Sequence, residues 1–394
     1  MIHSIDEAKR VYEDVVLWRR DLHRMPEVGL ELPKTSAYVA KKLKEMGISI
    51  KENIGVSGIV GLIEGANPGK TIALRADMDA LPIREESGLE FASQNGYMHA
   101  CGHDTHTAML LGAAKVLSEN RDKLNGNIKL IFQPGEEGPG GAELMLKEGA
   151  FEAPKVDGVL GLHIGSLVPD SKNGKVIVSY GGIMASADTF KITISGKGCH
   201  GAYPHEGIDP VVMAAYFITT LQTLVSREIS PTEPGVVTIG AVHGGHVPNI
   251  IPNTVELQGT IRAMTNEVRA NLLKRMEEIL KGITTTMRGS YEIEFKCGYP
   301  PVINNPEITK EFVKSAKKVV PEEDIIETKK PVMGGEDMSY YLQKVPGTFF
   351  FLSSSLPIDG VCYPHHNSKF AIDEEVMERG IALLVQAAVD WLSK

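Results

Sequence analysis

Segments with helical spacing of apolar residues alternate with short apolar strands over the first 163 residues of this 394-residue chain. Such alternation predicts an α/β layer around a largely parallel sheet. The predicted helices cover residues 5–24, 34–46, 105–117 and 142–148, and the predicted strands cover residues 59–64, 71–76, 127–133 and 156–163. A turn over residues 66–69, Ala-Asn-Pro-Gly, separates the first two strands.

The pattern changes over residues 188–296, where the order becomes strand, helix, strand, strand, helix, strand. That order is the ferredoxin-like split unit, and about 100 residues is an ordinary size for a compact domain. The alternation of helices and apolar strands then resumes. Helices are predicted over residues 308–319, 338–344 and 374–392, and a strand over residues 348–352. We therefore predict a large α/β/α domain, residues 1–184 and 297–394, interrupted by an α+β domain over residues 185–296.

The composition excludes several classes of protein. A net charge of -9 argues against a nucleic-acid binder, which normally presents a basic patch. No apolar run approaches the ~20 residues that span a bilayer, and the polar N-terminus has no signal-peptide core. The four cysteines show no disulfide-framework spacing, so we expect a reducing cytoplasm, where cysteine is more often metal-bound or catalytic.

Cys101 and His103 carry the strongest chemical signal in the sequence. A thiolate and a neutral imidazole are good ligands for borderline-soft divalent metals such as zinc. Two ligands alone are compatible with a structural zinc site, so the remaining partners decide the interpretation. Four further segments lie at predicted strand ends or in loops, where α/β proteins place their sites: Asp77-Met-Asp79, Gln133-Pro-Gly-Glu136-Glu137, His163 and His365-His366.

Each of these segments also has an ordinary structural interpretation. Adjacent glutamates form solvated acidic turns, a histidine closing an apolar strand is often a hydrogen-bonded core residue, and aspartates after a strand often stabilise turns. The chemical interpretation of Glu136-Glu137 is that one carboxylate ligates a metal while its neighbour remains free as a base.

In combination and in this order, the motifs closely resemble the metal-dependent aminoacylase and carboxypeptidase family. The resemblance runs essentially end to end, and its nearest subgroup holds hippurate hydrolases, indole-acetyl-amino-acid hydrolases and bacterial N-acyl-amino-acid amidohydrolases. It implies a di-metal peptidase-type catalytic domain with an inserted lid and dimerisation domain. The matching segments are Arg20-Asp-Leu-His23, Asp77-Met-Asp79-Ala-Leu-Pro82, His99-Ala-Cys-Gly-His-Asp-Thr-His106, Gln133-Pro-Gly-Glu-Glu-Gly138, Gly161-Leu-His163 and Pro364-His-His-Asn367.

The resemblance implies a two-metal site in which Cys101 bridges the ions. Wider relatives carry Asp in place of Cys101 and His in place of Asp77. This difference leaves the metal open among Zn, Mn, Ni and Co, and we do not count Asp77 as a ligand. Asp79 is expected to orient a ligand histidine. The implied ligands are Cys101, His103, Glu137, His163 and His366.

The implied chemistry needs a base and groups that hold the substrate. Glu136 would take a proton from a metal-activated water and pass it to the leaving amine. His200, in the inserted domain, would stabilise the oxyanion, often across a dimer interface. Asn249 and Arg262 would hold a substrate carboxylate, and the backbone at Gly335 would face the substrate.

Three of these assignments, those of His200, Arg262 and Gly335, also have simpler structural interpretations. His200 could be a loop histidine without a role, and Arg262 could form a structural ion pair. The Gly-rich segment around Gly335 could be a turn before the helix over residues 338–344, with Asp337 as its N-cap.

The leading hypothesis is a metal-dependent amidohydrolase that cleaves N-acyl-L-amino acids and works as a homodimer, or as a homotetramer. A carboxypeptidase acting on short peptides would use the same metal site and carboxylate clamp. A metal-binding module without catalysis is a third alternative, which the presence of Glu136 disfavours. In each case the partner is a small molecule or short peptide, with no role for nucleic acid or membrane.

Overall fold

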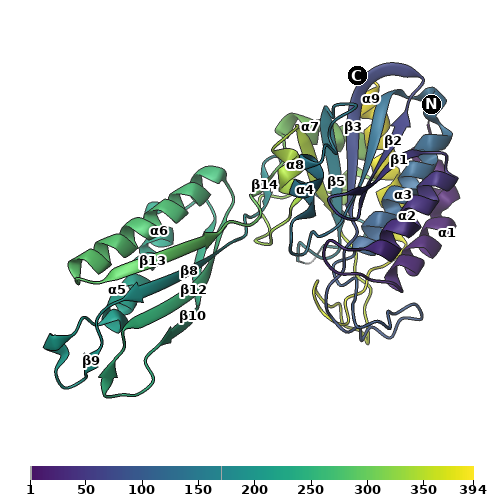
Figure 1. The fold of residues 1–394 in the computed structure, drawn as a ribbon. Coiled ribbons are helices and arrows are strands. Elements are labelled where there is room, and N and C mark those ends of the chain that lie inside the picture. Colours follow the sequence, from purple (N-terminus) through teal and green to yellow (C-terminus); the bar gives the residue numbers. More distant parts are fainter. Residues whose placement is uncertain (1, 170) are drawn as a thin grey trace. The chain divides into compact units, whose positions relative to one another are not determined.

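The computed structural model describes residues 2–169 and 171–394, which form two compact units (Figure 1). The large unit contains the chain up to Ile183 together with Asn304–Val332 and Asp337–Lys394. The small unit contains Met184–Ile303 and Met333–Glu336. None of the helices in these described residues combines the length and apolarity that crossing a bilayer requires.

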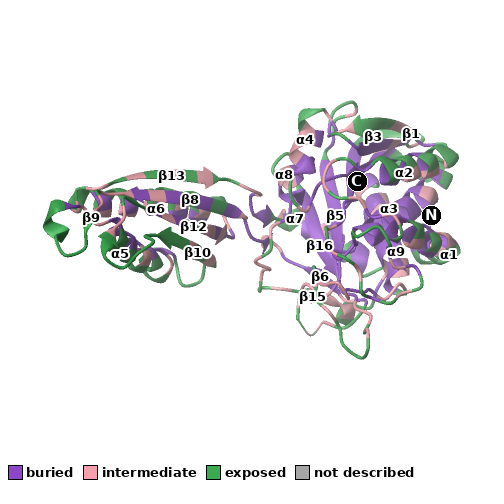
Figure 2. Cartoon of the chain, turned by 60° about the horizontal axis from the view of Figure 1, so that its bottom comes forward, coloured by how far each residue is buried: buried purple, intermediate pink, exposed green. Residues whose placement is uncertain are grey.

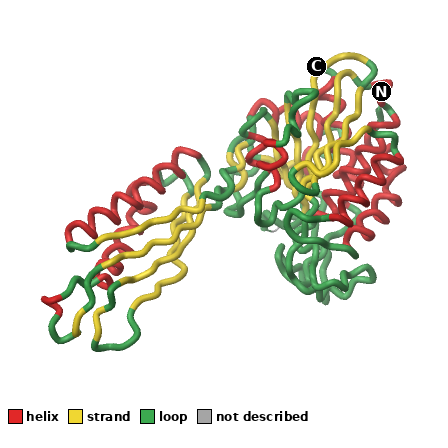
Figure 3. Tube along the Cα trace, viewed as in Figure 1, coloured by secondary structure: helices red, strands yellow, loops and turns green. Residues whose placement is uncertain are grey.

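The large unit is built on an eight-stranded mixed sheet (yellow strands in Figure 3). Strand β3 pairs in parallel with β4 and β5, and β5 pairs in parallel with β16. The carboxyl ends of these strands therefore meet at one edge of the sheet. The sheet order is β1 (Ser49–Ile54), β2 (Gly58–Glu64), β4 (Asn125–Gln133), β3 (Asn67–Asp77), β5 (Gly158–Ile164), β16 (Gly347–Leu352), β6 (Val176–Val178) and β15 (Ile325–Glu327).

Helices cover both faces of this sheet, and β5 and β16 are buried along their whole length (Figure 2). One face carries α1 (Ser4–His23), α2 (Pro33–Glu45), α3 (His103–Glu119), α7 (Pro306–Ala316) and α9 (Val376–Leu392), which share one apolar core. The opposite face of β5 meets α8 (Met338–Leu342), which packs beside α4 (Gly141–Lys147).

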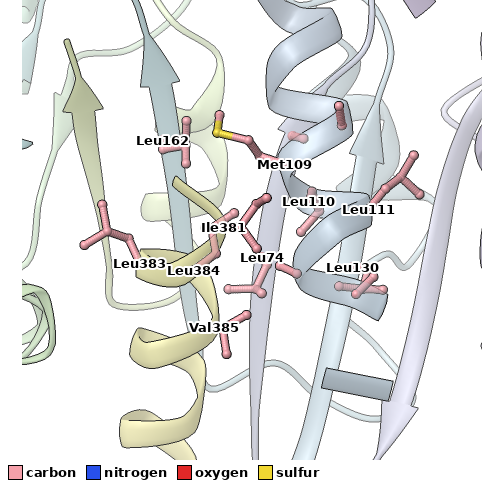
Figure 4. Close-up of a cluster of buried hydrophobic side chains, with 14 of the residues drawn as sticks. Leu74, Met109, Leu110, Leu111, Leu130, Leu162, Ile381, Leu383, Leu384 and Val385 are labelled. Atoms are coloured by element: carbon pink, nitrogen blue, oxygen red, sulfur yellow. The ribbon is translucent and has the colours of Figure 1, made fainter. Parts of the chain in front are cut away.

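The apolar layer between the sheet and helices α3 and α9 holds the strand ends in place (Figure 4). Leu74, Leu130 and Leu162 come from the three adjacent strands β3, β4 and β5, and all are nearly fully buried. They pack against Met109 of α3 and Ile381 of α9 in the same cluster. Because each buried leucine stabilises the fold by about 2 kcal/mol, this layer makes the sheet edge a rigid platform.

The small unit has its own core between a four-stranded antiparallel sheet and two helices. Phe190, Ile192 and Ile194 alternate with more exposed residues along β8, so one face of the sheet is covered. The chain order β8 (Asp188–Ser195), α5 (Pro210–Thr223), β10 (Gly235–Gly244), β12 (Thr254–Ala263), α6 (Asn266–Thr286) and β13 (Ser290–Lys296) is that of the ferredoxin-like unit.

Short strands complete the fold. In the small unit, β9 (Cys199–His200) pairs with β11 (Ile250–Ile251). Strands β7 (Gly182–Met184) and β14 (Val302–Ile303) pair with each other.

The predicted fold class is confirmed, and two local expectations differ from the structure. Residues 67–69 belong to β3 and not to a turn, because Asn67 pairs with Asn125 across a bulge in the β3–β4 ladder. Within the eight-stranded sheet, strands β1, β6 and β15 are missing from the prediction, as are the short strands β7, β9, β11 and β14 outside it. Of these, β1 is mostly exposed and the others are two or three residues long, so apolar spacing does not reveal them.

Candidate metal centre

The candidate site lies where the parallel strands of the large unit end. Asp77 is the last residue of β3, and Gln133 is the last residue of β4. His163 is the penultimate residue of β5, and His103 is the first residue of α3. The fold therefore gathers side chains that are far apart in sequence, as expected for the carboxyl edge of an α/β sheet.

Cys101 belongs to two separate groups of possible metal ligands. In one group it lies with His103 and His163, and in the other with Glu137 and His366, with all donor atoms of a group within 4.8 Å of one another. Sγ of Cys101 is 3.4 Å from Nε2 of His163, and Nε2 of His366 is 3.3 Å from Oε1 of Glu137. The structure thus brings together the five residues that the resemblance implies as ligands.

Two unusual backbone conformations shape this cluster. Gly102 has φ +89°, and a Cβ atom there would lie 2.7 Å from Cγ2 of Ile164. His366 has φ +62°, which non-glycine residues rarely adopt, and its N–H donates to the carbonyl of Ala100 at 2.9 Å. Glycine adopts this conformation freely, whereas a non-glycine residue such as His366 must be held in it by surrounding contacts, as is common at functional sites.

His103 presents one free ring nitrogen to the cluster. Its Nδ1 lies 2.9 Å from the backbone carbonyl of Asp79, and a carbonyl can only accept a hydrogen bond. Nδ1 therefore carries the proton, and the neutral ring has its lone pair on Nε2. That atom is buried without a hydrogen-bond partner among the described residues, as expected of a nitrogen that a metal completes.

Asp79 positions the two glutamates through its carboxylate. The backbone N–H groups of Glu136 and Glu137 donate to its Oδ1 and Oδ2 at 2.9 and 3.0 Å. Its carbonyl accepts the closer contact from Nδ1 of His103 at 2.9 Å, and its Oδ1 lies 3.4 Å from the same nitrogen. One buried residue therefore orients both the turn after β4 and the first residue of α3.

Asp77 is engaged by other protein groups. Its Oδ2 pairs with Nη1 of Arg75 at 2.7 Å, and its Oδ1 lies 2.6 Å from Nδ1 of His106. Burial favours the neutral acid, but Arg75 and the neighbouring imidazoles hold the pKa of Asp77 well below its ordinary value. These bonds favour a supporting role for Asp77.

The cluster has an excess of negative charge. Burial raises the pKa of the Cys101 thiol well above its ordinary value, and Glu137 and Glu136 add to the effect. Burial lowers the pKa of His103, but the carboxylates of Asp77, Asp79 and Glu137 outweigh it and raise that pKa to about 10. Since thiolate, imidazole and carboxylate suit borderline-soft divalent ions, the donor set fits such cations, which would displace these protons.

The expected oxyanion donor lies on the exposed two-stranded β9–β11 ribbon of the small unit. His200 on β9 accepts a hydrogen bond at Nδ1 from the N–H of Ala202 at 3.0 Å. The neutral ring therefore carries its proton on Nε2 and can donate it. The carbonyl of Asn249 accepts from the N–H of Gly201 at 2.8 Å, so Asn249 and His200 lie side by side at the β9–β11 ribbon.

Arg262 and Gly335 lie at the other end of the small unit. Nη1 of Arg262 donates to the carbonyl of Ile261 at 3.0 Å, and a Cβ at Gly335 would lie 2.7 Å from that of Ala187. Strand β12 separates Arg262 from the β9–β11 ribbon by roughly 25 Å, at about 3.3 Å per residue. Within one chain, Asn249 and Arg262 therefore do not meet around one carboxylate.

A buried polar network beside the cluster was not predicted. Arg75 donates to Gln133 at 2.9 Å and to Asp337 at 2.8 Å, in addition to its pair with Asp77. The carboxylate of Asp337 accepts from Arg75, from Gln133 and from the N–H of Ala142, and it makes no capping hydrogen bond to α8. One feature of the sequence could have revealed this network. Arg75 lies two residues before Asp77 in an apolar strand, so the two side chains are on the same face.

Comparison with known proteins agrees with this geometry. The model of peptidase family M20/M25/M40 matches residues 73–390, and the chain belongs to that family. It is 41% identical over 400 residues to thermostable carboxypeptidase 1 of Saccharolobus solfataricus, covering 100% of both chains. It is 44% identical over 305 residues to an N-acyl-L-amino acid amidohydrolase of Geobacillus stearothermophilus, covering 77% of this chain and 80% of the relative.

A solved structure shows the same likeness. A dinuclear metal-binding M20 peptidase of Bacillus subtilis superimposes with a TM-score of 0.85 and 32% identity, covering 98% of this chain and 99% of that one. The protein is therefore a metal-dependent hydrolase of the amidohydrolase and carboxypeptidase type, as its motifs predicted.

Proposed function

We propose that this protein hydrolyses the amide bond of N-acyl-L-amino acids at a two-metal site that Cys101 bridges. The observation that carries the proposal is the membership of Cys101 in both groups of ligand atoms. His103 and His163 would complete the ligands of one ion, and Glu137 and His366 those of the other. The relative named as an N-acyl-L-amino acid amidohydrolase supports this class of substrate.

Glu136 is the proposed base. Two bound divalent ions would polarise the amide carbonyl and lower the pKa of a water molecule. Glu136 would accept the proton and deliver it to the leaving amine. Its position supports this role, because it is buried, adjoins Glu137, and has Oε2 4.0 Å from Nε2 of His103.

Glu136→Gln tests the base, because glutamine keeps the size of the side chain but cannot take the proton. Turnover should fall by about 10²–10⁴-fold while metal content stays near two ions per chain. Glu143→Gln, on the exposed side of α4 beside Lys147, is the matched control. Retained turnover in Glu136→Gln would contradict the role of Glu136 as the base. Wild-type protein that binds no metal would contradict the proposed metal centre.

A carboxypeptidase that acts on short peptides is the second candidate. The 41% identity to a thermostable carboxypeptidase favours it, and it would use the same metal site. A panel of N-acetyl-, N-benzoyl- and benzyloxycarbonyl-amino acids against unmodified dipeptides separates the two. Faster turnover of the dipeptides would select the carboxypeptidase. Metal analysis of protein purified without added metal would decide among Zn, Mn, Ni and Co.

We further propose that the inserted domain, residues 185–296, acts as a lid and joins two chains. Strand β10 is an edge of its sheet and exposes Val236 and Val242, while α5 exposes Val211, Val212 and Tyr216. An open edge beside apolar side chains favours pairing with a second copy. Two chains would also allow His200 and Asn249 of one copy to serve the substrate held by Arg262 of the other.

Mixing two inactive variants tests this arrangement. If His200 acts on the partner's site, dimers formed from Glu136→Gln and His200→Ala chains contain one site with neither defect. Random pairing should then restore about a quarter of the wild-type activity. Absence of recovery would place His200 and Glu136 of one chain in the same site. Sedimentation separates a monomer, a dimer and a tetramer.

The reducing cytoplasm is proposed as the location of the protein. In the structure all four cysteines are free, and Cys297 and Cys362 are exposed. Free exposed thiols persist most readily where glutathione keeps them reduced. Fractionation of the source cells would test this.

A further inference from the structure

We propose that His106 and His365 are positioning residues that grip the backbone N–H and the backbone carbonyl of Ile164 and so aim His163 at Cys101. The proposal rests on the proposed function, because it concerns the orientation of one proposed ligand. Neither histidine belongs to the proposed ligand set. His106 lies in α3, and His365 directly precedes His366.

The backbone of Ile164 is contacted by three imidazole rings. Its N–H donates to Nε2 of His106 at 2.8 Å. Its carbonyl oxygen lies 3.0 Å from Nε2 of His365 and 2.8 Å from Nδ1 of His163. Since an amide N–H can only donate and a carbonyl can only accept, these contacts determine where the ring protons sit.

Each ring has one assigned tautomer in its neutral form. His106 has no proton on Nε2 and therefore carries it on Nδ1. His365 carries its proton on Nε2, and His163 carries its proton on Nδ1. His163 is thus left with a lone pair on Nε2, the atom 3.4 Å from Sγ of Cys101.

The same assignment gives the adjacent histidines His365 and His366 different roles. Nε2 of His365 is used by the carbonyl of Ile164, whereas Nε2 of His366 faces Oε1 of Glu137 at 3.3 Å. His366 therefore offers a nitrogen to the cluster, and His365 supports the strand end. A close approach makes this possible, because a Cβ at Gly165 would lie only 2.2 Å from Nε2 of His365.

Buried residues hold His106 in its contact with the N–H of Ile164. Nδ1–H of His106 donates to Oδ1 of Asp77 at 2.6 Å, and Oδ2 of Asp77 pairs with Nη1 of Arg75 at 2.7 Å. All three side chains are almost completely buried. The series Arg75, Asp77, His106 therefore ends on the peptide group next to His163.

Loss of either grip should weaken one metal ion more than the other. The ring of His163 takes its direction from the peptide that accepts its Nδ1–H, so a mobile peptide misdirects Nε2. Supporting groups of this kind typically contribute 10–100-fold to metal affinity. The second ion, proposed to lie between Cys101, Glu137 and His366, does not use His163.

The test is a competition titration of metal-free protein with Zn²⁺, which resolves the affinities of the two ions. In His365→Leu one ion should bind 10–100-fold more weakly, while the other should stay within threefold of wild type. His365→Gln should recover most of the loss, because its amide can donate from nearly the same place. His243→Leu, at an exposed position of β10, is the control.

Two results would overturn the proposal: unchanged binding of both ions in His365→Leu, or equal weakening of both ions with no recovery in His365→Gln. A wild-type chain that fails to bind two ions would instead overturn the proposed function. If the variants do not fold, ¹⁵N-histidine spectra of metal-free wild type give the answer. They should show Nε2–H on His365 and Nδ1–H on His106, and the opposite tautomers would contradict the grip.

Discussion

Sγ of Cys101 lies 3.4 Å from Nε2 of His163, although the two residues are 62 positions apart in the chain. Because Cys101 also lies within the group formed with Glu137 and His366, its removal should affect both ions. We expect Cys101→Ala to lower metal content below two per chain and to reduce turnover. Metal analysis after dialysis and a standard amidohydrolase assay measure the two effects.

The protonation of Cys101 adds a second observable. Its pKa is raised well above the ordinary value, so the metal-free site holds a thiol, and metal binding should release that proton. Calorimetry in buffers of different ionisation enthalpy counts the released protons, and Cys101→Ala should release about one fewer. Cys297→Ala, at an exposed position, is the control. Equal metal content and equal proton release in Cys101→Ala would contradict the bridging role.

Gly102 should tolerate no side chain. Gly102→Ala forces a residue with φ +89° to carry a Cβ atom 2.7 Å from Cγ2 of Ile164. Gly96 is a matched control, because it has φ +87° and no atom within 4 Å of its virtual Cβ. The left-handed conformation costs about 1–2 kcal/mol in both variants. The clash should cost Gly102→Ala roughly 1–3 kcal/mol more.

Urea unfolding of the metal-free variants measures this difference. Gly102→Ala should also bind metal more weakly, because Cys101 and His103 flank the altered residue. Equal destabilisation of the two alanine variants would show that the contact with Ile164 carries no strain.

The sequence predicted the main helices and strands because their apolar spacing is regular. In β8, for example, Phe190, Ile192 and Ile194 alternate with more exposed residues, and the observed strand has the predicted bounds. Strand β15 is only three residues long and partly exposed, so its pairing with β6 depends on tertiary contacts that spacing cannot express.

The candidate site was predictable only as a set of residue types. The chemistry of Cys101 and His103 indicates metal binding, and the order of the motifs indicates the other ligands. The supporting bonds are invisible in the sequence, because they depend on which atoms face each other. That Asp79 holds the Glu136–Glu137 turn with its carboxylate, and His103 with its carbonyl, follows only from the three-dimensional arrangement.

Arg75 should be the most sensitive charged residue of the buried network. Arg75→Met would leave Asp77 and Asp337 buried without their cation, and both carboxylates have no exposed side-chain surface. Removing one partner of a buried ion pair costs about 3–5 kcal/mol. We expect a loss of that size in the free energy of unfolding, measured by urea denaturation.

Arg275→Met in the small unit is the control for Arg75→Met. Arg275 pairs with Glu228 and Glu278, but these side chains are substantially exposed. Because solvent screens exposed pairs of this kind, Arg275→Met should change the free energy of unfolding very little. A similar small loss for both variants would show that the Arg75 network does not stabilise the fold.

His99 should make the fold sensitive to mild acid. Burial and, to a smaller extent, the nearby positive groups lower its pKa from the ordinary value of 6.5 to about 3. Between these two values the unfolded chain carries a proton on His99 that the folded chain lacks. Unfolding therefore takes up a proton, and stability falls as the pH decreases through this window.

His99→Leu removes this proton uptake. The free energy of unfolding of metal-free wild type should decrease more steeply with falling pH than that of His99→Leu, by up to about 1.4 kcal/mol per pH unit. Urea denaturation at several values between pH 6.5 and pH 5 measures both slopes. His246→Leu, at an exposed position, should keep the wild-type slope. Parallel slopes for wild type and His99→Leu would show that the folded chain accepts the proton at His99.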